Sequence, residues 1–392
     1  MTGAVGGSHR LFPDARVLRP TTKRLPQHTR SHNRALVLQT LYSSGTQSRA
    51  DIARTTGLTR AAISDLVAEL MVEGLLVETG PREEARPGKP ATLIELDRNA
   101  FQIVGVDLSD AATFRGGLLD LDGTIVDRED VALDGGTGAQ ALDTLIQLCE
   151  RLVARASAPL LGIGVGSPGI VDSQGTVETA PNLGWTDLPL RTLLAERFDV
   201  PVIVSNDADA ALLAEFSFGD TDNDMMLVKV GRGVGASLLL GGAPLTGTMN
   251  AAGEIGHVVA GSRGARCVCG KRGCLETWVA VPRLTAAFDE NGLDWRTPDG
   301  LAAGRPLLAE AGRRLGLVLA PVVAALNLTD VIVSGPERLL DGPFIDAAVD
   351  TVQQRTMRTY TGDLTMRLTT LGDDIVTRGA AMTVVSRVLG FS

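Results

Sequence analysis

Three of the chain's four cysteines lie within eight residues, in the stretch CVCGKRGC, as Cys267, Cys269 and Cys274. His257 lies ten residues before the first of them. In a reducing compartment, clustered cysteines indicate metal binding or thiol redox chemistry before they indicate disulfides. A Cys-x-Cys pair lacks the two-residue spacer of thioredoxin-type sites, so a redox pair is a weaker interpretation, as are three buried structural cysteines. The fourth cysteine, Cys149, lies in an apolar helical pattern and is expected in the core.

The composition is that of a globular protein with two or three domains: 392 residues, of which 44% are hydrophobic and 21% charged. The longest apolar stretch, LGLVLAPVVAALNL from Leu315, is shorter than the roughly 18 residues of a membrane helix. It is also expected to be broken by Pro321, so a buried helix is the better interpretation. The N-terminus lacks the apolar segment of a signal peptide. We therefore expect a cytoplasmic protein with no membrane partner.

The net charge of −9 hides an asymmetry between the two ends of the chain. Residues 1–90 carry 13 basic and 8 acidic side chains, a net charge of +5, which leaves −14 on the remainder. A basic head on an acidic body indicates a nucleic-acid-binding module, although a solvated basic tail has the same charge pattern. Within the head, residues 1–30 have six basic residues and no sustained apolar period, which predicts a disordered arm.

Residues 31–97 have the pattern of a winged helix-turn-helix. The stretch NRALVLQTLY has apolar residues at helical spacing, and a short second helix opens at Ser48 with Asp51 in a capping-box arrangement. Gly57 ends that helix in the turn TGLT. A third helix follows, and its apolar face consists of Ile63, Leu66, Val67, Leu70 and Met71. The next segment, LVETGPREEARPGKPATLIELD, predicts two strands around a charged loop, which is a wing.

The third helix of such a domain lies in the major groove, with its first residues towards the base edges. Arg60 is the strongest candidate, because a guanidinium can bond O6 and N7 of guanine together. Arg86 and Lys89, in the stretch RPGKP of the wing, suit the minor groove. Each of these side chains taken alone could be an ordinary surface charge. The candidate DNA contacts are Arg34, Ser48, Thr59, Arg60, Ser64, Arg86 and Lys89.

Residues 98–392 alternate between strand and helix patterns. Buried-strand runs such as FQIVGVDLS and LLGIGVGS lead into polar turns, and amphipathic stretches such as GAQALDTLIQLCERLVARA indicate helices. This alternation predicts an α/β body with mixed sheets, which at about 290 residues is large enough for two lobes and a cleft. We expect a smaller lobe of residues 98–205 plus 377–392 and a larger lobe of residues 206–376.

Several stretches of this body, in order along the chain, resemble those of the ROK family of repressors, open reading frames and kinases. They are IVGVDLS, GVGSPGIVD, PNLGWTDLPL, NDADAALLAE, VGRGVGASLLLGG, AGEIGH and CVCGKRGCLET. The resemblance covers nearly all of residues 31–392, and the combination of GEIGH with CxCGxxGCLE is its most specific part. It implies lobes with the actin-like/ribonuclease-H-like fold. With the winged helix, it indicates the repressor branch, in which a sugar or sugar phosphate controls operator binding.

The resemblance implies one structural zinc ion per chain, with the ligands His257, Cys267, Cys269 and Cys274. One nitrogen and three sulfurs that form a closed set of four ligands are typical of such a site. Gly270 and Gly273 are expected to let the backbone fold tightly enough for the three sulfurs to converge.

The resemblance also implies a sugar site, made of Asn206, Asp207, Glu254, His257 and Glu276. Each sugar hydroxyl is both a donor and an acceptor, which carboxylates and an amide can match. One ring nitrogen of His257 would bind zinc and the other would donate to the sugar. Taken alone, Asp207 could be a helix N-cap, and Glu254 and Glu276 could be solvated carboxylates. Asn182 is a weaker candidate for the same cleft.

In ROK kinases the residue that corresponds to Asp207 is the general base. The motifs of this sequence that would bind the nucleotide depart from the kinase pattern. Ser109 replaces a glycine of the first phosphate motif, and Asp110 follows it with a charge that opposes phosphate. Arg232 stands where kinases usually have a small hydroxyl residue, and Pro336 replaces a late glycine. We therefore expect a binding protein, not an enzyme, with Asp207 a vestigial base; an active hexose kinase with an accessory DNA-binding domain is the alternative.

The expected partners are a palindromic operator DNA, a sugar or sugar-phosphate effector, and further copies of the chain in a homodimer or homotetramer. DNA binding would make the protein nucleoid-associated. A phosphorylated effector would need a cationic group, for which Arg232 and Arg266 are candidates. A third hypothesis is a regulator with a vestigial cleft that responds to a partner protein.

Overall fold

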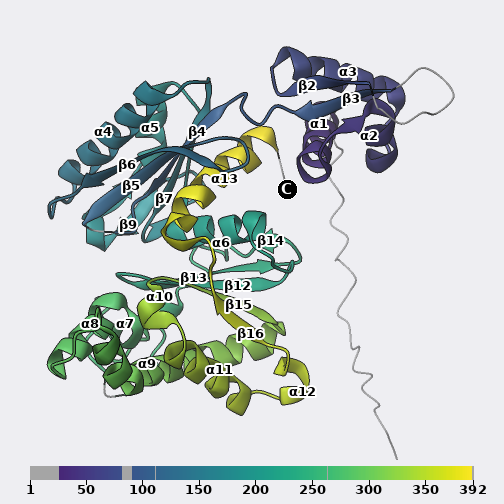
Figure 1. Cartoon of the computed structure of the whole chain (residues 1–392). Coiled ribbons are helices and arrows are strands. Elements are labelled where there is room, and N and C mark those ends of the chain that lie inside the picture. The colour runs from purple at the N-terminus through teal and green to yellow at the C-terminus, as the bar shows by residue number, and fades with distance from the viewer. Residues whose placement is uncertain (1–25, 82–90, 111, 263, 391–392) are drawn as a thin grey trace, which may run out of the picture.

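The computed structural model describes residues 26–81, 91–110, 112–262 and 264–390 (Figure 1). These residues form a small N-terminal domain and a larger α/β body around two five-stranded sheets. Arg86 and Lys89 of the expected wing loop lie outside the described residues, so their DNA contacts stay predictions.

The N-terminal domain is a winged helix-turn-helix. Its three helices are α1 (Pro26–Ser44), α2 (Arg49–Thr56) and α3 (Arg60–Val72), and its antiparallel sheet has the order β1 (Gln47–Ser48), β3 (Thr92–Leu96) and β2 (Leu76–Pro81). The prediction of an arm up to residue 30 was too long, because α1 already begins at Pro26. Proline suits a first helical turn, and the next turn is attached to α3 by an ion pair of Arg30 with Glu69.

Local capping signals define α2 as predicted. The Ser48 hydroxyl accepts the backbone N–H of Asp51, and the Asp51 carboxylate accepts the backbone N–H of Ser48, which completes the capping box. Gly57 ends the helix with a φ of 71°. Met71 of α3 is only partly buried, whereas the rest of the predicted apolar face lies in the core: Ile63, Leu66, Val67 and Leu70.

The first sheet of the body has the order β11-β7-β4-β5-β6. Its strands are β4 (Gln102–Asp107), β5 (Thr113–Leu119), β6 (Ile125–Ala132), β7 (Leu160–Ser167) and β11 (Val202–Asn206). Helices α4 (Ala139–Arg155) and α5 (Leu190–Phe198) cover one face (Figure 1). A small sheet of β8 (Ile170–Val171), β9 (Val177–Ala180) and β10 (Trp185–Leu188) lies beside it. The 3-10 turn η1 (Pro181–Leu183) connects β9 to β10. The buried strand β4 and buried Cys149 agree with the predictions from their apolar patterns.

The second sheet has the order β14-β13-β12-β15-β16. Its strands are β12 (Met225–Val230), β13 (Val234–Leu240), β14 (Ala243–Pro244), β15 (Asp330–Ser334) and β16 (Thr365–Leu368). One face packs on α6 (Asp207–Phe218). The elements around the other face are η2 (Ile255–His257), α7 (Glu276–Val279), α8 (Val281–Glu290), α9 (Pro298–Leu326), α10 (Glu337–Leu340), α11 (Pro343–Arg355) and α12 (Arg358–Thr361).

Helix α9 contains the longest apolar stretch of the sequence. It continues through both Pro306 and Pro321, so Pro321 does not break it. Leu315, Leu319 and Val323 lie in the core over the second sheet, as expected for a buried helix. Among the described helices, none is long and apolar enough to cross a membrane.

Helix α13 (Ile375–Leu389), preceded by the 3-10 turn η3 (Gly372–Asp374), packs against both the body and the winged helix. It lies between the first sheet and α6 (Figure 1). A Cβ on Gly379 would be 1.8 Å from the carbonyl oxygen of Ala210, so α13 and α6 meet backbone to backbone. Near the other end of α13, Leu389 lies in the same apolar cluster as Leu41 of α1.

The predicted lobe boundaries fall at the junction between the two sheets. Strand β11 ends at Asn206, and α13 begins at Ile375, two residues before the expected return to the smaller lobe. Helix α6 contacts α13 as well as β12 and β13, so it belongs to the junction. The boundaries at residues 205 and 377 stay predictions.

The Leu389→Ala variant is expected to loosen the winged helix from the body. Leu389 is 2% exposed, and truncation of a buried leucine costs about 2–5 kcal/mol. Hydrogen exchange should become faster for the amides of α1 and change little in β12 and β15. The control Leu326→Ala removes a side chain that is 37% exposed and should leave both regions unchanged. If the α1 amides of Leu389→Ala exchange at the wild-type rate, Leu389 does not hold the winged helix to the body.

Candidate functional site

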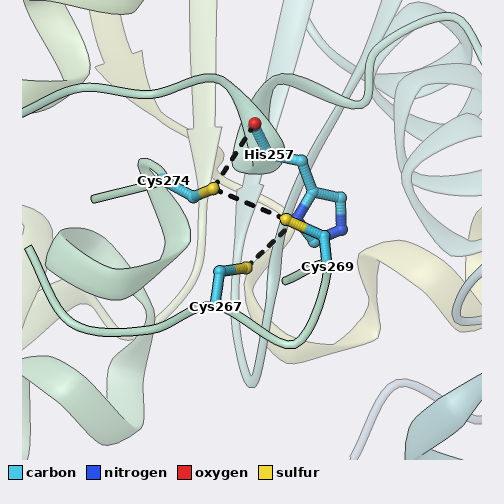
Figure 2. A group of neighbouring side chains, drawn as sticks. All are labelled: His257, Cys267, Cys269 and Cys274. Atoms are coloured by element: carbon cyan, nitrogen blue, oxygen red, sulfur yellow. Dashed lines mark hydrogen bonds between the residues drawn. The ribbon is translucent and has the colours of Figure 1, made fainter. Parts of the chain in front are cut away.

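Four side chains from the segment after β13 converge on one point (Figure 2), and they are His257, Cys267, Cys269 and Cys274. Their ligand atoms all lie within 4.8 Å of one another. The Cys267 Sγ is 3.4 Å from His257 Nδ1, and the Cys269 Sγ is 3.6 Å from the Cys274 Sγ. A tetrahedral ion with metal–sulfur bonds of about 2.3 Å places its sulfurs about 3.8 Å apart. The cluster therefore has the donor types and the spacing to hold a metal ion.

Two glycines shape this loop, as the sequence predicted. Gly270 has a φ of 90° and Gly273 a φ of 74°, both in the left-handed region. A Cβ on Gly273 would lie 1.7 Å from the carbonyl oxygen of Gly261, so no larger side chain fits there. The Cys267 N–H donates to the Lys271 carbonyl at 2.8 Å and closes the turn that carries the cysteines.

The three thiols differ in acidity. Burial raises the pKa of the Cys274 thiol to about 12, and it also raises the pKa of Cys267. The backbone N–H of Lys271 is the main cause of a lowered pKa at Cys269. Because a metal binds the thiolate form, loading of this cluster must release protons.

A cavity of about 410 Å³ lies next to the cluster. All five residues of the predicted sugar site line it, and so does Asn182, the weaker candidate. The five are Asn206, Asp207, Glu254, His257 and Glu276. The fold brings them together from the junction of β11 with α6, from η2, and from the start of α7.

The N-terminus of α6 forms one wall of this cavity. The Asn206 side chain accepts the backbone N–H groups of Ala208 and Asp209, so Asn206 is the cap of α6. Its Nδ2 donates to the Gly169 carbonyl at 2.7 Å, which leaves one amide N–H for a ligand. The alternative role of Asp207 as the N-cap is therefore wrong, and its carboxylate points to another partner.

Three side chains, those of His257, Glu254 and Glu276, line the cavity on the side of the cysteine cluster. The His257 Nε2 lies 3.9 Å from Glu254 Oε2, whereas its Nδ1 faces the cysteines. Glu276 Oε2 accepts the Val234 N–H at 3.3 Å. Burial raises the pKa of Glu254, His257 opposes this shift, and the carboxylates Asp207 and Glu276 add to it. A hydroxyl-rich ligand would thus find acceptors and donors on both sides.

Lys229 is a residue of this site that the sequence analysis missed. It lies on β12, and its Nζ is 3.1 Å from Asp207 Oδ2. Burial disfavours the ammonium, but Asp207 and Asp107 together raise the pKa of Lys229 above its ordinary value. The signal was a single lysine in the otherwise apolar strand MMLVKV, since a cation buried in a strand needs a carboxylate partner.

A second cavity of about 540 Å³ lies on the other side of Lys229. The residues in which the sequence departs from the kinase pattern line it, namely Ser109, Asp110, Arg232 and Pro336. Asp107 is buried here, accepts the Ser109 N–H at 2.8 Å, and has a pKa that burial raises and Lys229 opposes. Asp373 lines the same cavity. Three carboxylates, those of Asp107, Asp110 and Asp373, therefore line this cavity together with three cations, Lys229, Arg115 and Arg232, and Arg115 pairs with Asp373 at 3.6 Å.

The winged helix presents the first residues of α3 to solvent. Thr59, Arg60 and Ser64 are exposed, and the Arg60 guanidinium has no carboxylate partner within the described part of the chain. One predicted DNA contact needs correction, because Ser48 is 3% exposed and uses its hydroxyl in the α2 cap. Arg34 forms an ion pair with Glu73, and its DNA contact stays a prediction.

Comparison with solved structures places the fold. A crystal structure described as a ROK family transcriptional regulator, homolog of the E. coli MLC protein, matches with a TM-score of 0.81 at 22% identity. The match covers 92% of this chain and 97% of that chain. A ROK family glucokinase from Streptomyces griseus, in complex with glucose and AMPPNP, matches with a TM-score of 0.60 at 24% identity, over 72% of this chain and 98% of that chain. Regulators and kinases thus share the body, and the regulator match extends over nearly the whole chain.

Sequence comparison gives the same assignment. The xylose repressor of Caldicellulosiruptor bescii is 28% identical over 92% of this chain and 96% of its own length. The model of the ROK family matches residues 103–387, which is well over half of the chain. The actin-like body predicted from the glycine-rich and cysteine motifs is confirmed, and the chain belongs to the ROK family.

Proposed function

We propose that this chain is a DNA-binding transcriptional repressor whose operator binding is controlled by a sugar in the 410 Å³ cavity. One observation carries the proposal. The same chain joins a winged helix with an exposed α3 N-terminus to a cavity lined by hydroxyl-binding side chains, and α13 packs against both the body and the winged helix. Similarity to a xylose repressor over nearly the full chain supports it.

On the DNA side, α3 would enter the major groove, with Arg60 reading a guanine and Thr59 and Ser64 beside it. Arg86 and Lys89 of the wing would contact the minor groove. The operator would be a palindrome read by a homodimer or homotetramer, because two related half-sites match two copies of one winged helix. The body would keep its acidic surface away from the phosphates.

On the effector side, Asn206 and Asp207 would bind hydroxyls from one side, and Glu254, His257 and Glu276 from the other. The side chains come from both the first-sheet and the second-sheet part of the body, so a bound sugar would favour one arrangement of the two parts. A ligand shifts such an equilibrium only by its different affinity for the two arrangements. Through α6 and α13, that difference would reach the winged helix.

The metal in the cysteine cluster would be zinc. Three thiolates and one imidazole in a closed set are the ligands of a structural zinc site. The ion would take His257 Nδ1 and so fix the proton of the imidazole on Nε2, which faces Glu254 and the cavity. Zinc would orient a sugar contact without touching the sugar.

An active sugar kinase is the second candidate, favoured by the match to a glucokinase over 72% of this chain. Two features of the site oppose it. Asp110 adds an exposed carboxylate to the first phosphate motif, and the Asp207 carboxylate, which a kinase would need as its base, is paired with the Lys229 ammonium. We therefore propose that catalysis is absent and that sugar binding is retained.

The Glu254→Ala variant should uncouple operator binding from the effector. Loss of a charged hydrogen-bond partner costs about 1.5–3 kcal/mol, so the sugar concentration for half-maximal response should rise by about 10- to 100-fold. The measurement is titration of the chain's own promoter DNA with xylose, glucose and N-acetylglucosamine at fixed salt. Arg60→Ala is the reciprocal variant: it should weaken DNA binding and leave sugar affinity unchanged. A wild-type response of Glu254→Ala would refute the sugar site.

Removal of the metal should blunt the sugar response before it abolishes DNA binding. Cys274→Ser is expected to lose the ion and, with it, the fixed orientation of His257, whereas the apolar cluster that contains the winged-helix core includes none of the four ligands. Elemental analysis and the same titrations check both effects. Cys149→Ala removes a thiol from the core of the first sheet and should keep one zinc per chain. A wild-type chain that folds and responds to sugar without zinc would contradict the proposed role.

The full chain should form no ADP from Mg-ATP with any of a panel of hexoses. The physical reason is that the Asp207 carboxylate is paired with the Lys229 ammonium, which opposes its action as a general base on the sugar hydroxyl. A coupled ADP assay measures this, with the unsubstituted chain compared to Asp207→Ala. ADP formation that disappears in Asp207→Ala would establish the kinase instead.

A further inference from the structure

The position of Lys229 on β12 is unusual for a lysine. The strand is buried, and Met225 and Leu227, which share its face by the two-residue alternation, pack in an apolar cluster with α6. Lys229 is the next residue on this face, and its side chain reaches Asp207, the first residue of α6. Its side chain is 15% exposed and the Asp207 side chain 14%, so the ion pair is largely withdrawn from water but still open to the cavity.

Lys229 also lies on the wall between the two cavities. It lines both of them, together with Ser109 and Arg232. On the side away from the sugar residues, the buried Asp107 of β4 and the exposed Asp110 act on the ammonium, and Arg115 and Arg232 line the same cavity. The ammonium thus has Asp207 as its partner at the sugar-side cavity and two further carboxylates near it at the second cavity.

We propose that Lys229 and Asp207 together bind a single sugar hydroxyl in both of its roles. The Lys229 ammonium would donate to the hydroxyl oxygen, and the hydroxyl would donate to the Asp207 carboxylate, which a hydroxyl with one donor and two acceptor positions permits. This inference rests on the proposed function of the cavity as a sugar site. It adds a positively charged contact to the five residues already placed there.

The pair also selects the chemical class of effector: a sugar whose hydroxyl at this position is free. A phosphate ester there would bring a charge of about −1.5 to −2 beside Asp107, Asp110 and Asp207, against one buried ammonium. Arg232, Arg266 and Arg283 also line the sugar-side cavity, but all three are exposed, so solvent and salt weaken their attraction for a phosphate. A hydrogen bond from the ammonium to the hydroxyl oxygen would also make that hydroxyl a weaker nucleophile.

Calorimetry on the full zinc-loaded chain tests the inference. The ligands are xylose, glucose, N-acetylglucosamine and glucose 6-phosphate, followed by the monodeoxy analogues of the tightest binder. Lys229→Met keeps the side-chain length and removes the charge; Lys229→Met/Asp207→Asn also removes the carboxylate that would be left alone. Arg305→Met removes an exposed charge that lines neither cavity and is the control.

Lys229→Met should weaken the tightest sugar by about 10- to 100-fold, with no change in the control. For one deoxy analogue, the affinity of the wild type should fall by a similar factor relative to the parent sugar. Lys229→Met and the wild type should then bind that analogue with equal affinity. Wild-type affinity in folded Lys229→Met and in the double variant would overturn the inference while the sugar site stands. A preference of the wild type for glucose 6-phosphate over every free sugar would overturn the selectivity. Silence of the wild type with every ligand would instead refute the sugar site itself, and Lys229 would be only a counter-ion.

Discussion

The close contact between α6 and α13 is the constraint on which the rest of the molecule depends. Gly379 meets the Ala210 carbonyl with no room for a side chain, so the two helices cannot slide or separate without losing a packed backbone interface. Helix α6 starts at the cavity with Asn206 and Asp207, and α13 ends in the apolar core of the winged helix. Helix α6, whose first residues line the cavity, is therefore in direct contact with α13, and α13 packs against the DNA-binding domain.

The chemistry of the cleft follows from where charges are buried. Lys229 is tolerated inside a strand because Asp207 and Asp107 compensate its desolvation, and this places one ammonium between two cavities of different character. The cavity beside the cysteine cluster offers an amide, an imidazole and carboxylates, whereas the other is lined by the carboxylates Asp107, Asp110 and Asp373 and by the cations Arg115 and Arg232 in addition to Lys229.

Several features were predictable because their causes are local. The capping box of Ser48 and Asp51, the left-handed Gly57, the buried run of β4 and the two glycines of the cysteine loop each depend on a few neighbouring residues. The features that the sequence did not indicate have the opposite cause. Glu73, at the C-terminal cap of α3, pairs with Arg34, and Asn206 caps α6 because β11 ends there. Lys229 escaped notice because its partner lies on another element.

The sequence by itself determined the family, the winged helix ahead of the body, and the residue types of the metal cluster and the cavity, because motif spacing and hydrophobic period are properties of the chain read in order. Tertiary structure alone decided which of those residues face one another. It turned the two nitrogens of His257 towards different neighbours, set an ammonium against Asp207, and joined α13 to the winged helix. Such pairings arise between segments far apart in the chain, where only the packing of whole elements fixes distance.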